Sequence, residues 1–284
     1  MWALAPTRMA EPASLRIALM RKIKSVLFKL AARNAGSRLY APHKVSELRR
    51  LLELPFDPDA VPKGFGHKLD ERLVEYPWLF FRLPKTPGEL LDAGSVLNHD
   101  FVLRHPGLKS KKITIMTLAP EGHSFWNLGI NYVYGDLRQT YFRGDYFDFI
   151  VCVSTLEHIG LDNQRFHSGQ LSNLGHAGSH LDAVKGFRRT LKPGGRCYIT
   201  VPFGKRFRGH WHQVFDGDMI DELVATFRPS SFKETYFRHL PGAGWQTSSR
   251  KAASDAVYFD YQVDRPWPGC PAAAEAVACL ELEK

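Results

Sequence analysis

Short apolar runs alternate with stretches of helical periodicity from residue 89 onward. Five of these runs have the β-branched and aromatic content typical of buried strands, and each ends in a turn: residues 89–94, 111–122, 131–139, 146–159 and 196–204. Residues 179–195 predict a helix that stops at Pro193-Gly194-Gly195. Strands that alternate with helices predict an α/β fold with a doubly wound, mostly parallel sheet covered on both faces.

The remaining segments flank this pattern on both sides. After it, residues 218–227 predict a helix, 233–240 an extended segment, and 276–282 a further strand. Before it, residues 51–88 mix short helical pieces with Pro-rich breaks, so we expect a connector or lid. Its aromatic residues are interpreted as core packing: Tyr76, Trp78, Phe80 and Phe81.

Residues 14–33 predict an amphipathic helix within a basic N-terminal arm, residues 1–50. Its apolar face carries seven residues: Leu15, Leu19, Met20, Ile23, Val26, Leu27 and Leu30. Arg21, Lys22, Lys24 and Lys29 lie on the opposite face. Two interpretations stay open: a helix packed on the domain edge, and an interfacial helix drawn to anionic lipid.

The sequence pI of 9.4 reflects basic residues that are concentrated in the N-terminal arm. Residues 1–50 hold eleven Lys or Arg and two Glu, while the remaining chain is neutral. A nucleic-acid partner is disfavoured, because such proteins present a basic face on the folded domain. The longest apolar runs are far shorter than the ~20 residues of a membrane span.

Cysteine and histidine spacing gives no sign of a metal site. The four cysteines form no C-x-x-C pair, which favours neither zinc nor a disulfide framework and suggests a cytoplasmic setting. His167, His176 and His180 lie in a long loop, residues 160–180, but match no familiar ligand spacing. Long loops at this edge of a sheet typically carry substrate contacts.

Open parallel sheets bind ligands beyond the carboxyl ends of their strands. The residues directly after the predicted strands are therefore the candidate site. They are Asp92, Ala93, Gly94 and Ser95, then Thr117 and Leu118, then Asp136 and Leu137, and finally Ser154 through Leu156, Glu157 and His158.

The ordered segments LLDAGS, ITIMTLAPE, VYGDLR, FDFIVCVSTLEHI and LKPGGRCYITVPFG resemble the class I S-adenosylmethionine-dependent methyltransferases. The resemblance covers residues 89–204 and implies that 89–284 form one methyltransferase domain. It further implies a seven-stranded Rossmann-like sheet with an antiparallel seventh strand. S-adenosylmethionine is the implied cofactor, across the ends of the first three strands.

The resemblance implies a cofactor contact at nine strand-end residues: Asp92, Ala93, Gly94, Ser95, Thr117, Leu118, Asp136, Leu137 and Ser154. Gly94 lets backbone approach the amino-acid portion, Asp92 holds the turn or the cofactor ammonium, and Asp136 receives the adenine amino group. Two positions depart from the family pattern. Val96 replaces a second glycine, and Thr117 replaces the acid that binds the ribose hydroxyls, for which Glu121 is the alternative.

Methyl transfer to a hydroxyl needs a base, and His158, with Glu157 beside it, is the candidate. Residues 203–216 contain Lys205, Arg206 and Arg208 with Trp211, which suits a sugar-like acceptor or a solvated basic loop. We expect O-methylation of a small-molecule or glycan acceptor. Two alternatives stay open: an inactive methyltransferase-like scaffold, supported by Val96 and Thr117, and an RNA or protein methyltransferase.

Overall fold

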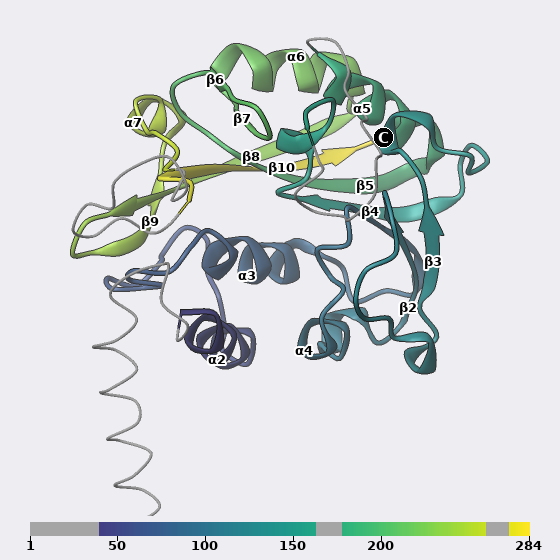
Figure 1. Ribbon diagram of the computed structural model, residues 1–284, viewed down its shortest axis with the longest axis horizontal. Helices are drawn as coiled ribbons and strands as arrows, with labels where there is room; N and C mark the ends of the chain where they lie inside the picture. The colour runs from purple at the N-terminus through teal and green to yellow at the C-terminus, as the bar shows by residue number, and fades with distance from the viewer. Residues whose placement is uncertain (1–39, 163–177, 260–272) are drawn as a thin grey trace, which may run out of the picture.

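The computed structural model describes residues 40–162, 178–259 and 273–284, and an eight-stranded sheet forms its centre (Figure 1). The strand order is β3-β2-β1-β4-β5-β10-β8-β9. In chain order the strands are β1 (Gly88–Ala93), β2 (Lys111–Thr117), β3 (Asn131–Tyr134), β4 (Phe147–Val153), β5 (Leu191–Pro202), β8 (Ser231–Leu240), β9 (Gly244–Ser248) and β10 (Ala276–Glu283). The first five strands are parallel, whereas β10 runs antiparallel between β5 and β8. The predicted mostly parallel sheet is confirmed, with β9 as an additional antiparallel strand.

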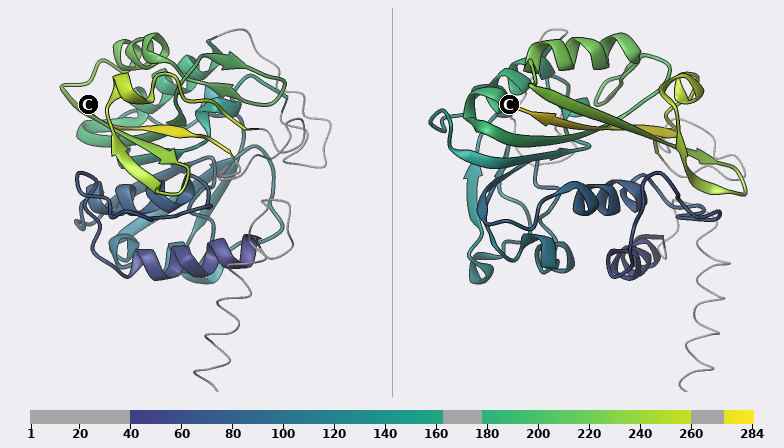
Figure 2. Two further views of the ribbon diagram at one scale, coloured as in Figure 1. Left: turned by 90° about the vertical axis from the view of Figure 1, so that its left-hand side faces the viewer. Right: turned by 180° about the vertical axis from the view of Figure 1, so that it is seen from behind.

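Helices cover both faces of the sheet (Figure 2). One face carries α5 (Ser179–Thr190) and α6 (Gly217–Phe227), and the other carries α2 (Tyr40–Leu52), α3 (Arg72–Arg82) and α4 (Asp100–Leu103). The short helix α7 (Arg250–Ala253) follows β9, and β6 (Phe207–Arg208) pairs with β7 (Gln213–Val214) in a separate ribbon. Four single 3-10 turns complete the described elements: η1 (Pro106–Leu108), η2 (Trp126–Leu128), η3 (Leu137–Gln139) and η4 (Leu156–His158).

Two hydrophobic cores lie on opposite faces of the sheet. Alternate residues of each strand point to opposite faces, so Leu90 packs in one core and Leu91 in the other. Residues of α2 and α3 belong to the same core as Leu90. Tyr76 and Trp78 of α3 are each 1% exposed, as the core interpretation requires, whereas Phe81 is 51% exposed. The connector therefore forms one packed wall of the domain.

The connections between the first strands differ from the simple alternation of strand and helix. Only η2 lies between β2 and β3, and only η3 between β3 and β4. Helices α2 and α3, which precede the sheet in sequence, instead help to cover the face that also carries α4. The predicted helix of residues 14–33 lies outside the described residues. None of the helices in the described ranges is long and apolar enough to span a bilayer.

Candidate active site

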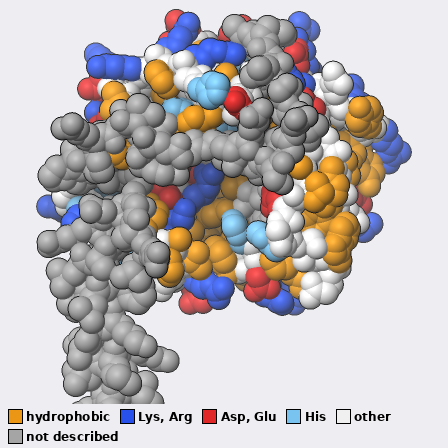
Figure 3. Space-filling model, viewed as in Figure 1, with side chains coloured by type: hydrophobic (Ala, Val, Ile, Leu, Met, Phe, Trp, Pro, Cys, Tyr) orange, Lys and Arg blue, Asp and Glu red, His pale blue; other side chains and the backbone are white. Residues whose placement is uncertain are grey.

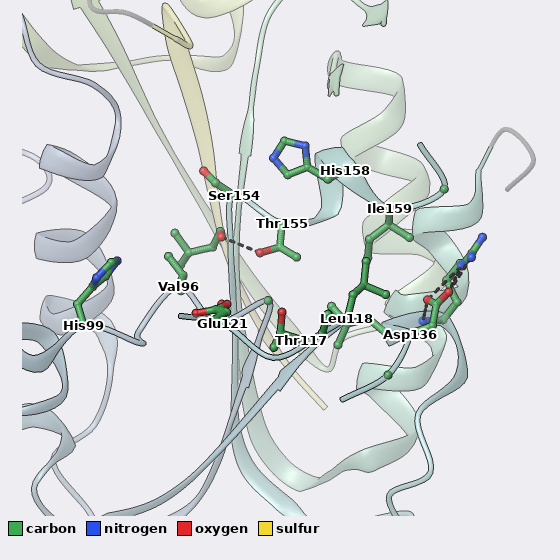
Figure 4. Close-up of a pocket in the computed structure, with 18 of the residues that line it drawn as sticks. Val96, His99, Thr117, Leu118, Glu121, Asp136, Ser154, Thr155, His158 and Ile159 are labelled. Atoms are coloured by element: carbon green, nitrogen blue, oxygen red, sulfur yellow. Dashed lines mark hydrogen bonds and ion pairs between the residues drawn. The ribbon is translucent and has the colours of Figure 1, made fainter. Parts of the chain in front are cut away.

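A cavity of about 400 Å³ lies beyond the carboxyl ends of β1, β2, β3 and β4. Its volume falls within the roughly 300–1,000 Å³ typical of small-molecule sites. Eight residues predicted from the sequence line it: Gly94, Ser95, Thr117, Leu118, Asp136, Leu137, Ser154 and His158. Leu118, Ile159 and Asp136 lie toward one end of the cavity and His99 toward the other (Figure 4).

Three predicted residues are buried behind this lining. Ala93 and Asp92 are fully buried, and Glu157 is 3% exposed. The Asp92 carboxylate oxygen Oδ2 accepts the backbone N–H of Leu97 at 2.8 Å, so Asp92 holds the turn after β1. Burial raises the pKa of Asp92 to about 8, against the lowering effect of the backbone N–H groups of Leu97 and Val96. Asp92 is thus a neutral acid at pH 7 that shapes the turn from beneath.

Gly94 has a packing role in addition to the cofactor contact expected from the sequence. Its φ is +114°, a conformation that side-chain-bearing residues rarely adopt. A Cβ atom at this position would lie 2.1 Å from Oγ1 of Thr155. The glycine therefore lets the turn after β1 pack directly against the turn after β4. The closest obstacle to a side chain at Gly94 is Thr155 of the protein.

The acid on the cavity floor near the end of β2 is Glu121, four residues after Thr117 (Figure 4). Its Oε1 accepts the Ser95 hydroxyl, and its Oε2 accepts Nδ2 of Asn98 at 2.7 Å. Asn98 is 1% exposed, and its Oδ1 accepts the Tyr132 hydroxyl at 2.8 Å. This network fixes the loop after β2 against the turn after β1 and holds a carboxylate beside Thr117.

Asp136 lies at the other end of the cavity, after β3. Its Oδ1 accepts the backbone N–H of Arg138 at 2.9 Å, which begins η3. The Arg138 side chain also binds the carboxylate, with Nε 3.1 Å from Oδ1 and 3.0 Å from Oδ2, and Nη2 2.6 Å from Oδ2. Asp136 raises the pKa of Arg138 through these hydrogen bonds, which favour the charged guanidinium.

Ser154, after β4, connects the cavity to α3. Its φ of +40° is unusual for a residue with a side chain, and such conformations persist only where surrounding contacts hold them. The Ser154 hydroxyl donates to Oε1 of Glu75 at 2.7 Å, and the Thr200 hydroxyl donates to the same oxygen at 2.6 Å. Glu75 is fully buried and forms an ion pair with Arg72. A buried carboxylate on α3 therefore holds the turn after β4.

Arg72 and Tyr76 of α3 line the cavity, although the sequence favoured core packing alone for Tyr76 and gave no role to Arg72. The Tyr76 hydroxyl donates to the backbone oxygen of Val96, so α3 also holds the turn after β1. A sequence signal exists, because Arg72, Glu75 and Tyr76 place polar groups at helical spacing within an otherwise apolar helix. Basic and histidine side chains lie near the centre of the face shown in Figure 3.

His158, in η4, lines the cavity beside the turn after β4. Its Nδ1 lies 2.9 Å from the backbone oxygen of Trp211. Because a carbonyl oxygen only accepts, Nδ1 carries the proton and the lone pair of the neutral ring is on Nε2. Nε2 is 3.8 Å from Oε1 of Glu157, whose pKa burial raises well above its usual value. The Trp211 ring stacks on the imidazole with centroids 5.3 Å apart.

The basic loop, the long loop and the cysteines were also considered as candidate sites. Arg206 of the basic loop is paired with Asp216, with Nε and Oδ2 2.7 Å apart, which favours a solvated loop at that residue. Most of the long loop, residues 163–177 with His167 and His176, lies outside the described residues. Within the described ranges, no group of three or more His, Cys, Asp and Glu could hold a metal ion. Cys152, Cys197 and Cys279 are buried free thiols.

Comparisons with known proteins agree with this geometry. Residues 111–199 match the family model of a methyltransferase domain. No curated protein matches the chain significantly.

Three solved structures similar to this chain are described as methyltransferases of different small molecules. A possible histamine N-methyltransferase of Thermotoga maritima is 13% identical over 75% of this chain and 89% of its own, with a TM-score of 0.46. The 1,6-didemethyltoxoflavin-N1-methyltransferase of Burkholderia thailandensis, with S-adenosylhomocysteine bound, is 13% identical over 99% and 93%, with a TM-score of 0.45. The phosphoethanolamine N-methyltransferase 2 of Haemonchus contortus is 15% identical over 66% and 42%, with a TM-score of 0.40.

The matched segment holds β2, β3 and β4, with the cavity residues that follow each of them. The strand order adds the antiparallel closing strand expected of the same fold. Residues 111–199 thus match a methyltransferase domain, within a fold that resembles that of the class I S-adenosylmethionine-dependent methyltransferases.

Proposed function

We propose that this methyltransferase acts on a hydroxyl group of a small-molecule acceptor, with His158 as the general base. The observation that carries the proposal is the tautomer of His158. The backbone oxygen of Trp211 holds the proton on Nδ1, so Nε2 is the nitrogen able to take a proton. A hydroxyl acceptor must lose a proton during transfer, and a base placed at the cavity wall meets that need.

The cavity residues fit the cofactor in size and in kind. Leu118, Leu137 and Ile159 supply apolar surface for the adenine beside Asp136. Thr117 and the anchored carboxylate of Glu121 are the candidates for the ribose hydroxyls, and Arg72 and Ser154 for the amino-acid portion. When bound, S-adenosylmethionine supplies a methyl group already activated by its sulfonium. The protein therefore contributes mainly alignment and proton removal.

The acceptor proton moves to Nε2 of His158, and the imidazolium that forms keeps its Nδ1–H bond to the Trp211 oxygen. Burial raises the pKa of Glu157 well above its usual value, which disfavours a charged carboxylate beside the resting imidazole. An uncharged imidazole is the form that accepts a proton.

The partly exposed Trp211 ring beside the cavity residue His158 favours a ring-bearing acceptor such as a sugar or a phenol. Trp211 stacks on His158, and the rings of His212 and Tyr258 lie 4.1 Å apart next to it. Flat aromatic surfaces favour the faces of such rings. A glycan acceptor, membrane contact through residues 14–33 and a cytoplasmic setting stay predictions from the sequence.

The test is a methyl-transfer assay with a labelled methyl donor and a panel of sugars, phenols and amines. We expect base-stable methyl ethers as products. In the His158→Gln variant kcat falls by about 10²–10⁴-fold, the usual contribution of a general base. The affinity for S-adenosylhomocysteine, measured by calorimetry, stays within about twofold because His158 acts on the acceptor. Products methylated on nitrogen alone reject the hydroxyl acceptor.

The matched control is His43→Gln, on α2 away from the cavity, which leaves kcat unchanged. The pH dependence of kcat/KM adds a second readout: its acid limb is present in the wild type and absent in His158→Gln. An unchanged kcat in His158→Gln removes the base from the mechanism but leaves cofactor binding intact.

A further inference from the structure

The carboxylate of Asp136 is fully engaged by one neighbouring residue. Oδ1 accepts two donors from Arg138, the backbone N–H at 2.9 Å and Nε at 3.1 Å. Oδ2 also accepts two, Nε at 3.0 Å and Nη2 at 2.6 Å. A carboxylate offers about four lone-pair sites. Three N–H groups of Arg138 engage both oxygens, with that of Nε shared between them, so an arriving amino group must compete with Arg138 for Asp136.

The pair is also shielded from water. The Asp136 side chain is 24% exposed and that of Arg138 is 18% exposed. Charge-assisted, two-pronged hydrogen bonds in such surroundings are stronger than surface ion pairs. Both residues line the cavity at the end with Leu118 and Ile159, which is the proposed adenine end.

We propose that Arg138 sets the affinity and base selectivity of the cofactor site by competing with adenine for Asp136. The inference rests on the proposed cofactor orientation. For the adenine amino group to bind Asp136, the guanidinium must turn away, which vacates Oδ2. The backbone N–H of Arg138 stays on Oδ1, so η3 and the position of the carboxylate survive the exchange.

The competition predicts a selectivity that is lower than Asp136 alone would give. Adenine presents an amino donor to the carboxylate, whereas hypoxanthine presents a carbonyl oxygen, which a guanidinium can serve. The ion pair thus weakens adenosyl ligands more than inosyl ligands. Replacing Arg138 by an uncharged side chain of similar length leaves Asp136 to select the amino group.

The experiment is calorimetric titration of S-adenosylhomocysteine and S-inosylhomocysteine into the wild type, Arg138→Met, Asp136→Asn and the double variant. Arg138→Met binds the adenosyl ligand about five- to tenfold tighter, which is the loss of one partly buried ion pair. It binds the inosyl ligand no tighter. The variant with both Arg138→Met and Asp136→Asn does not show the tighter binding of S-adenosylhomocysteine. Arg143→Met is the matched control, an exposed arginine in the loop after η3, and its affinities stay within about twofold.

Each result decides a different claim. Unchanged or weaker adenosyl binding in Arg138→Met, with the wild type binding normally, overturns the competition. A gain that persists in the double variant also overturns it, because Asp136 is then not the group released. Absence of binding in every variant rejects the proposed cofactor site itself. Arg138→Lys, which keeps the charge with a single donor group, guards against a folding defect and gives an intermediate gain.

Discussion

Two walls of the cavity are built by different physical means. The wall of strand-end turns is fixed by the backbone of the sheet: the N–H of Gly94 donates to Met116 at 2.9 Å, and that of Gly135 donates to Thr117 at 2.9 Å. The opposite wall, α3, is fixed by side chains, chiefly the buried carboxylate of Glu75. The strand-end wall forms as soon as the strands pair. The α3 wall depends on a few buried polar side chains.

The difference shows where the site is vulnerable. Removing one backbone hydrogen bond from a sheet leaves the others in place. Removing Glu75 takes away the carboxylate that pairs with Arg72 and that accepts the hydroxyls of Ser154 and Thr200. Breaking a buried pair costs far more than the pair itself contributes, because an uncompensated charge remains.

The largest expected effect comes from Glu75→Ala, which breaks the α3 wall. We expect the free energy of unfolding to fall by about 3–5 kcal/mol. Glu47→Ala on α2 is the matched comparison, since Glu47 and Arg50 have the same i,i+3 spacing but are 27% and 58% exposed. That change costs about 0.5 kcal/mol or less. Urea unfolding of both variants measures the difference, and equal losses would show that burial does not distinguish the two pairs.

Gly94→Ala tests the strand-end wall and has the next largest effect. The added Cβ meets Thr155, and the φ of +114° disfavours any side chain. We expect a loss of about 1–3 kcal/mol from the backbone conformation, with a weaker affinity for S-adenosylhomocysteine. The control is Gly122→Ala, where a Cβ meets nothing within 4 Å.

Thr155→Gly sharpens this test as a second change. It removes the contact but leaves the unfavourable φ, so it restores part of the stability lost in Gly94→Ala. Full stability in Gly94→Ala alone would contradict the tight packing of the two turns.

The smallest expected effect is a pH dependence in the strand-end wall. Burial raises the pKa of Asp92 to about 8, while in the unfolded chain it ionises near 4. Between these values the unfolded state loses its proton and the folded state keeps it, so stability falls as the pH rises. The Asp92→Asn variant has no carboxyl group at this position, so its stability does not fall with rising pH for this reason.

The difference in unfolding free energy between wild type and Asp92→Asn should shift by at most about 1.4 kcal/mol between pH 6 and 7. The variant gains relative stability at the higher pH. Chemical denaturation at three pH values measures the shift, and parallel curves for the two proteins would mean that folding does not perturb Asp92.

The strand-end residues could be predicted because their signals are local. The runs that form β1 to β5 are apolar, and each ends in a turn whose residues necessarily meet at one edge of a parallel sheet. Arg72, Glu75 and Tyr76 could not be placed in the same way. Their position depends on how α3 packs across the sheet, and Glu75 and Thr200, which share a hydrogen bond, are 125 residues apart.

The packing role of Gly94 could not be predicted, for a related cause. A glycine after the first strand is a local signal, but its neighbour Thr155 comes from a turn 61 residues later. Side-chain pairs such as Asp136 and Arg138 are close in sequence, yet their bonding geometry needs coordinates. Sequence patterns therefore predicted the sheet edge well, and the contacts between its turns poorly.

The position of β10 in the sheet means that the sheet can be completed only late in synthesis. β10 follows the other described strands in the chain, yet it lies between β5 and β8 and pairs with both. While the ribosome has still to release residues 276–283, the β8–β9 hairpin has no neighbour, and an edge of β5 is exposed. A nascent chain thus carries two open strand edges, which invite pairing with other chains until the final strand is inserted.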